Sequence, residues 1–172
     1  MTTPDQLIAE VISAADGEIV GRIRLQKVFY LLEQAGLGSG LPFHYHYYGP
    51  YSRELDHALD RAQSLRGVQE RIEYRKVDGM PYSIFSLEQH ERADGGRGVG
   101  GLQRDAAKAL IGAMKGRSST VLELAATIHW LINREHISDW RRELVRRKGV
   151  KGERGRTQEA LELLEKLGLA PA

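Results

Sequence analysis

Residues 68–87 read VQERIEYRKVDGMPYSIFSL. Asp78-Gly79 is a strong signal for the tight turn of a β-hairpin. The flanking stretches 68–76 and 82–87 contain Ile72, Tyr74 and other residues that favour strands. The sequence therefore predicts a β-hairpin at the end of its first half.

The segments before this hairpin favour helices, with one short strand among them. Apolar residues recur at helical spacing in 3–16 and in 22–35. From 41 to 48 aromatic residues alternate with others, which is a strand pattern, and Gly49-Pro50 should end that strand. Ser52 is a candidate N-cap for a helix over 53–65. The order helix, helix, strand, helix, hairpin is typical of winged-helix domains.

The second half of the chain is predicted to be helical. Five glycines within 91–102 indicate a linker or exposed loop. Helices are expected after it, and in one of them Thr120 and Glu123 form a capping box. Their expected ranges are 102–114, 121–134, 139–148 and 158–167. We expect a mainly helical α+β fold in which a winged-helix-like half (1–90), with its small strand and hairpin sheet, and a helical half (102–172) pack together, joined by a glycine-rich linker or loop (91–101).

Composition excludes several classes of protein. The chain has 172 residues and no cysteine, so it has no disulfide scaffold, thiol nucleophile or iron–sulfur cluster. The uncharged stretch 124–133 is about half of the ~20 residues that a membrane span needs. The N-terminus lacks the basic region of a secretory signal. We therefore expect a cytoplasmic protein without a membrane partner.

Positive charge is concentrated near the C-terminus. The net charge is +2, and residues 141–156 contain eight basic and two acidic residues. Such density suits contact with phosphates, with the hairpin as a wing. The predicted recognition helix over 53–65 argues against this, because its acids outnumber its bases. The residues of this nucleic-acid-binding hypothesis are Arg71, Arg75, Lys76, Arg141, Arg142, Arg146, Arg147, Lys148, Lys151, Arg154 and Arg156.

Aromatic residues are concentrated elsewhere, since five of the chain's twelve lie between Phe43 and Tyr51. The segment 45–52, YHYYGPYS, suits either a structural turn packed on the preceding helix or a contact surface. Tyrosines serve both roles, because a tyrosine can bury its ring and keep its hydroxyl in water.

No motif points to catalysis or to a cofactor. His44 and His46 share a strand face, but no metal-ligand motif supplies further ligands. Glu123 and His129 are six apart on a helix and therefore point in different directions, so we expect a helix cap and a core histidine. Phosphate-binding, hydrolase and metalloprotease motifs are absent from the sequence. An enzyme with a pocket at His46 and Tyr48 is the third hypothesis, after protein and nucleic-acid binding.

Two motifs carry a resemblance to a known family. RIRLQKVFYLL at 22–32, followed by YYGPYSREL at 47–55, resembles the YwgA-type family of uncharacterised prokaryotic proteins, as does LELAATIHWL at 122–131. The motifs are more distantly similar to the Panacea domain of SocA-like antitoxins. That resemblance implies a protein that neutralises toxins mainly by protein contact, and no enzymatic role for the motif residues.

The sequence as a whole thus predicts a non-catalytic interaction or regulatory module of the antitoxin or defence-associated type. Its partner would be a protein such as a toxin, and the alternative is a nucleic-acid-binding regulator. We expect no catalytic residues, no cofactor and no metal. The predicted partner-binding residues come from the LQK helix and the aromatic turn: Arg24, Gln26, Lys27, Tyr30, His46, Tyr48, Gly49, Pro50 and Tyr51.

Overall fold

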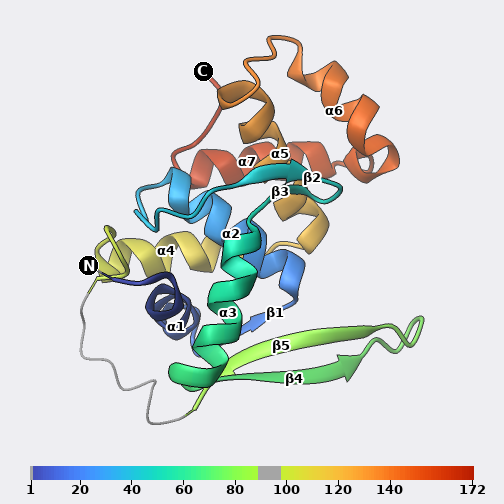
Figure 1. Ribbon diagram of the computed structural model, residues 1–172. Coiled ribbons are helices and arrows are strands. Elements are labelled where there is room, and N and C mark those ends of the chain that lie inside the picture. The colour runs from blue at the N-terminus through green and yellow to red at the C-terminus, as the bar shows by residue number, and fades with distance from the viewer. Residues whose placement is uncertain (1, 89–97) are drawn as a thin grey trace.

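The computed structural model describes residues 2–88 and 98–172, and Figure 1 shows how their helices and strands are arranged. In chain order the elements are α1 (Pro4–Ala14), β1 (Glu18–Val20), α2 (Arg22–Gln34), β2 (His44–His46), β3 (Gly49–Tyr51), α3 (Arg53–Leu65), β4 (Val68–Tyr74), β5 (Pro81–Leu87), α4 (Arg104–Lys115), α5 (Ser119–Asn133), α6 (Trp140–Lys148), the 3₁₀ turn η2 (Gly149–Gly152) and α7 (Arg156–Lys166).

The N-terminal half contains the predicted hairpin. Strands β4 and β5 pair antiparallel, from Val68 opposite Leu87 to Tyr74 opposite Pro81. β1 joins the other edge of β5, so the strand order is β1-β5-β4. With α1, α2 and α3 this gives the winged-helix-like arrangement, and the hairpin extends away from the helices at one end of the molecule (Figure 1).

Two strand predictions need correction. β1 was not expected, because three residues are too few to show a periodicity and its order comes from pairing with β5. The strand expected over 41–48 covers only His44–His46. Gly49-Pro50 does not end the strand region, because Gly49–Tyr51 turns back as β3 and pairs with β2.

Helix starts also differ from the predicted ones. The Ser118 side chain accepts a hydrogen bond from the Val121 backbone and caps α5, so Thr120 and Glu123 do not form the capping box. The helix expected from 139 begins one residue later, as α6 at Trp140, and is capped by Asp139. The helix expected from 158 begins two residues earlier, as α7 at Arg156, after Gly155, which has a left-handed backbone conformation.

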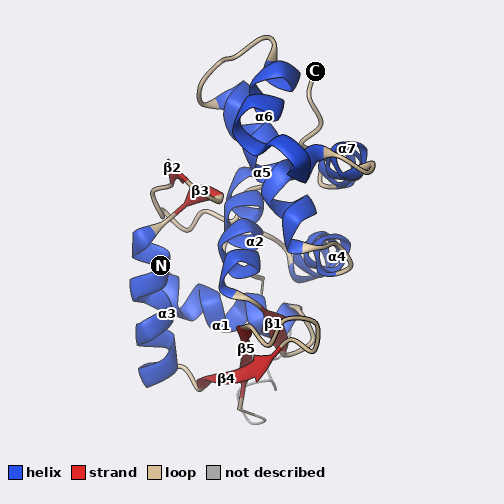
Figure 2. Ribbon diagram, turned by 90° about the vertical axis from the view of Figure 1, so that its right-hand side faces the viewer, coloured by secondary structure: helices blue, strands red, loops and turns tan. Residues whose placement is uncertain are grey.

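The C-terminal half is built around α5, whose residues from Val121 to Leu131 are all buried. It packs against α2 and β3 of the first half and against α6 and α7 of the second (Figure 2). One continuous core joins the two halves. The mainly helical α+β fold class is therefore confirmed. Most of the predicted linker lies outside the described residues, and the domain boundaries stay a prediction.

Within residues 2–88 and 98–172, no helix is both long enough and apolar enough to cross a membrane.

Candidate functional site

The LQK motif of α2 holds the aromatic hairpin in place. The Gln26 side-chain amide pairs with Ser52, donating to its carbonyl oxygen at 2.8 Å and accepting from its backbone nitrogen at 2.9 Å. Lys27 Nζ donates to the Pro50 carbonyl oxygen at 2.7 Å. These bonds satisfy backbone groups that the two short strands leave unpaired. The LQK and GPYS motifs thus form one structural unit, held by bonds between residues 23 and 26 positions apart in the chain.

Gly49 is required where this hairpin meets α5. Its φ is +91°, a conformation that side chains disfavour, and a Cβ built there would lie 2.9 Å from Thr127 Oγ1. We expect Gly49→Ala to lower the free energy of unfolding by about 2 kcal/mol, from backbone strain and overpacking together. Urea unfolding measures this loss.

Gly79→Ala is the matched control, because Gly79 has φ +71° and no atom within 4 Å of its built Cβ. Gly79→Ala should therefore lower the free energy of unfolding through backbone strain alone. Equal losses in the two variants would show that the close approach of Gly49 to α5 does not matter.

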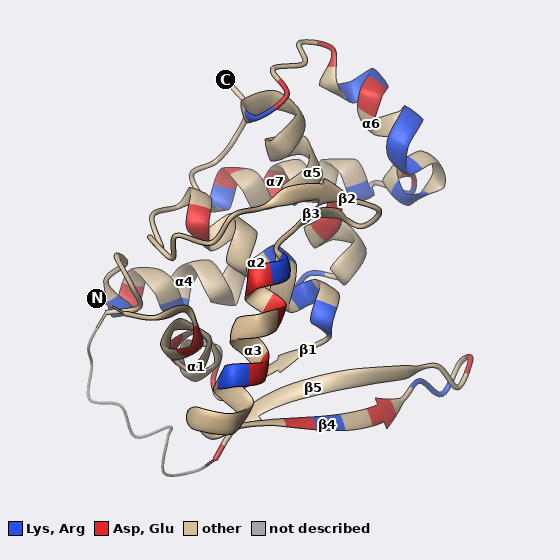
Figure 3. Cartoon of the chain, in the orientation of Figure 1, with Lys and Arg blue, Asp and Glu red and all other residues tan. Residues whose placement is uncertain are grey.

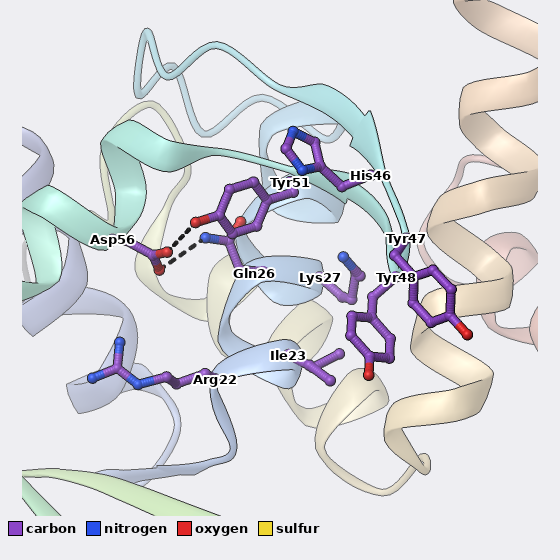
Figure 4. Close-up of a pocket in the computed structure, with 9 residues that line it drawn as sticks. All are labelled: Arg22, Ile23, Gln26, Lys27, His46, Tyr47, Tyr48, Tyr51 and Asp56. Atoms are coloured by element: carbon purple, nitrogen blue, oxygen red, sulfur yellow. Dashed lines mark hydrogen bonds between the residues drawn. The ribbon is translucent and has the colours of Figure 1, made fainter.

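A cavity of about 300 Å³ opens beside the hairpin. Its lining comes from α2, the β2–β3 hairpin and the first turn of α3, as Figure 4 shows. Asp56 accepts hydrogen bonds from the Tyr51 hydroxyl and from Gln26 Nε2. The hydrogen bond to this carboxylate raises the pKa of Tyr51. The lining residues are Arg22, Ile23, Gln26, Lys27, His46, Tyr47, Tyr48, Tyr51 and Asp56.

Two tyrosines stand at the rim of this cavity. Tyr47 is 83% exposed and Tyr48 is 47% exposed, and their rings meet edge to face with centroids 5.0 Å apart. The hairpin that carries them is anchored below by Lys27, which is 1% exposed. The two tyrosines therefore form an aromatic surface on an anchored hairpin. Tyrosine is one of the residue types enriched in interaction hot spots.

A buried ion cluster lies under the same hairpin. Glu123 Oε2 on α5 is 2.9 Å from Lys148 Nζ and 3.0 Å from Lys151 Nζ. Lys148 Nζ also donates to the Tyr47 carbonyl oxygen at 3.1 Å. Burial lowers the pKa of Lys27 to about 8, and the positive charges of Lys148 and Lys151 act in the same direction, whereas Glu123 opposes it.

Tyr30 and His129 form a polar pair inside the core. The Tyr30 hydroxyl lies 2.9 Å from His129 Nδ1, and both side chains are buried. Burial raises the pKa of Tyr30 and lowers the pKa of His129. The expectation of a hydrogen-bonded core histidine is confirmed.

The predicted partner-binding residues therefore separate into three groups. Gln26, Lys27, His46, Tyr48 and Tyr51 line the cavity. Gly49, Pro50 and Tyr30 are buried beneath it or in the core. Arg24 lies apart, because its guanidinium donates to the carbonyl oxygens of Val20 and Arg117.

The predicted nucleic-acid-binding residues do not form one surface. The hairpin bases and the 141–156 segment lie at opposite ends of the molecule (Figure 3). Many of them are occupied within the chain. Carboxylates pair with Arg71, Arg75, Arg146, Arg147, Lys148 and Lys151, and Arg156 donates to the carbonyl oxygens of Val150 and Lys151.

The remaining bases have other surroundings. Arg141 stacks over the Trp140 ring at 4.6 Å, and Arg142 lies exposed at the start of α6. Lys76 and Arg154 are exposed in turns. Pairing with carboxylates reduces the charge that the segment offers to phosphates but does not cancel it, since Lys148 and Lys151 share one carboxylate.

Sequence reasoning left four residues out of the predicted site. Arg22, Ile23, Tyr47 and Asp56 line the cavity. Tyr47 lies in the aromatic turn between predicted site residues, so its position in the sequence could have identified it. Glu123 was interpreted as a helix cap. A lone carboxylate among apolar residues on one helix would have indicated a buried acid that needs a cation.

The fold and this site define a class of mainly helical α+β protein with an aromatic hairpin held by an LQK helix. The chain is 30% identical over 131 residues to a DNA ADP-ribosyl glycohydrolase of Thermus aquaticus, a match that covers 72% of this chain and 34% of that protein. It is also 30% identical over 116 residues to the uncharacterised protein YwgA of Bacillus subtilis, covering 65% of each. No family model matches the chain.

These similarities confirm one prediction in part and contradict another. The match to YwgA supports the resemblance to the YwgA-type family, whereas the link to the Panacea domain stays a prediction. The prediction that the chain is not an enzyme is contradicted, because a 30% identical relative is named as one. The chain spans a third of that relative's length, so the relative's activity bears on this chain only as a proposal.

Proposed function

We propose that this chain is a recognition module in a system that adds ADP-ribose to DNA and removes it. Its partner would be the enzyme that attaches ADP-ribose, whose action a DNA ADP-ribosyl glycohydrolase reverses. This proposal joins the antitoxin-type function expected from the sequence with the activity for which the Thermus relative is named.

The exposed tyrosine pair carries the proposal. Tyr47 and Tyr48 present aromatic rings at the mouth of a cavity. Gln26 and Lys27 hold the backbone of Ser52 and Pro50 at the end of the same hairpin, and Lys148 donates to the Tyr47 carbonyl oxygen. Because the surface is already held in place, binding costs little ordering entropy. Arg147, which stacks over Tyr45 of the hairpin, is neutralised by Glu135 and Glu143 and adds little attraction for a phosphate backbone, which favours a protein partner.

The double variant Tyr47→Ala/Tyr48→Ala is expected to weaken binding to a DNA ADP-ribosyltransferase from the same genome by roughly 30-fold or more, the loss typical of aromatic hot spots. Titration calorimetry with the two purified proteins measures the change.

Tyr74→Ala is the control, because Tyr74 is an exposed tyrosine on the distant β4–β5 hairpin. It should leave the affinity unchanged. Unchanged affinity in the double variant would refute the proposed surface, and an absence of binding by the wild-type chain would refute the choice of partner.

A second candidate is hydrolysis of ADP-ribosylated DNA by this chain, and the similarity to the Thermus enzyme favours it. His46 and Tyr48 line one cavity with Lys27 and Asp56, which supports this candidate. Incubation of the chain with an ADP-ribosylated oligonucleotide tests it. Released ADP-ribose that disappears in His46→Ala would establish this activity, and intact substrate would exclude it.

A further inference from the structure

A second cavity, of about 530 Å³, adjoins the first at the β2–β3 turn, since His46 and Tyr47 line both. Three of its lining residues are aromatic side chains of the hairpin, and the other three are basic residues of α6 and η2. Among residues 2–88 and 98–172, no carboxylate lines it. The residues are Tyr45, His46, Tyr47, Arg147, Lys148 and Lys151.

The lysines of this cavity carry more positive charge than their partner neutralises. Both contact one carboxylate, Glu123, at 2.9 and 3.0 Å. The Lys148 side chain is only 3% exposed, so water screens its charge poorly. Lys27 adds a third positive charge close to Glu123. Buried charges are normally matched, and Glu123 is the one carboxylate that the described part of the chain places against both lysines, so part of the positive charge is left unmatched.

Arg147 does not share this excess. Its guanidinium bonds to Glu135 at 2.6 Å and to Glu143 at 2.6 Å, so two carboxylates neutralise it. It stacks over the Tyr45 ring at 4.8 Å and acts as a rigid wall of the cavity. The attraction for an anion is therefore concentrated at the lysine side.

Aromatic faces lie next to the lysines. Lys151 Nζ is 5.9 Å from the centroid of the Tyr47 ring, and Lys148 Nζ is 5.5 Å from that of Tyr45. The Tyr47 ring is largely exposed and offers a face to a planar partner. A ligand that uses both the lysine charge and the tyrosine ring has a flat aromatic ring with a doubly charged anionic group attached close to it. Nucleobases stack on tyrosine, and phosphates suit lysine.

We propose that the cavity between the β2–β3 hairpin and α6–η2 binds a nucleoside phosphate, with the phosphate at Lys148 and Lys151 and the base against Tyr47. This goes beyond the proposed function, because it gives the chain a small-molecule or DNA-end ligand next to its protein-binding surface.

Calorimetric titration with ADP, adenosine and inorganic pyrophosphate tests the proposal. ADP should bind at least about tenfold more tightly than adenosine or pyrophosphate, because only ADP supplies both the ring and the anion. A 5′-phosphorylated oligonucleotide compared with its unphosphorylated form shows whether a DNA end is the better source of the same group. Phosphate-dependent binding by either source supports the site.

Lys151→Gln is the diagnostic variant, because Lys151 is part-exposed on η2 and Lys148 still pairs with Glu123 without it. It should weaken ADP binding by roughly tenfold, the worth of one hydrogen bond to a charged group. Arg142→Gln, on the same basic segment but outside the cavity, should leave binding unchanged.

Three results would overturn the proposal: no saturable binding of ADP or of the phosphorylated oligonucleotide, equal binding of ADP and adenosine, or undiminished binding by Lys151→Gln. The tyrosine-dependent protein contact is measured separately with the transferase, so failure of one proposal leaves the other standing.

Discussion

Glu123→Gln is expected to lower the free energy of unfolding by about 3–5 kcal/mol, the range observed when one partner of a buried ion pair is removed. Glutamine keeps the size and shape of the side chain, so packing on α5 is preserved. The loss comes from charge, because the buried ammonium of Lys148 then loses the carboxylate that it contacts at 2.9 Å. Urea unfolding of the two proteins gives the difference directly.

Lys151→Gln is the matched comparison for this variant. It removes the partly exposed member of the cluster and leaves the buried pair intact, so its cost should be about 0–1 kcal/mol. The double variant Glu123→Gln/Lys148→Met, which removes both buried charges, should regain part of the loss. A loss below about 1 kcal/mol for Glu123→Gln would show that the cluster does not stabilise the fold.

Local patterns were sufficient to predict most of the fold. The helical spacing of apolar residues in 22–35 predicted α2, and Asp78-Gly79 predicted the hairpin, because both signals lie within a short stretch of chain. β1 and β3 escaped prediction for a shared reason. Each has three residues and owes its order to a partner strand or helix rather than to its own periodicity.

Sequence motifs identified those residues of the candidate site that belong to the motifs. Residues that come together only in the folded chain were missed. Gln26, Lys27 and Tyr48 come from the LQK and GP motifs and do lie together. The basic run 141–156 suggested a free charged face, because sequence gives no view of the carboxylates that fold onto it. Glu123 and Glu135 come from α5 and the loop after it, and they turn much of that charge inward.

The stability of the chain is expected to rise with pH through the titration of Lys27. Its pKa falls from 10.5 to about 8 on folding, with burial as the largest cause. Between these values the unfolded chain binds more protons than the folded one, so the free energy of unfolding increases as pH rises. A pKa shift of this size predicts that the free energy of unfolding rises by about 2 kcal/mol between about pH 7.5 and 9.5.

The comparison with Lys27→Met isolates this effect, because all other titrating groups contribute to both proteins. Methionine fills the space of the lysine stem but carries no charge, and it loses the bond to the Pro50 carbonyl oxygen at every pH. Wild type should therefore gain stability relative to the variant by about 2 kcal/mol over that window. If the free energies of unfolding of the two proteins changed with pH in parallel, Lys27 would titrate as it does in the unfolded chain. That result would contradict the burial of its ammonium group and refute the prediction.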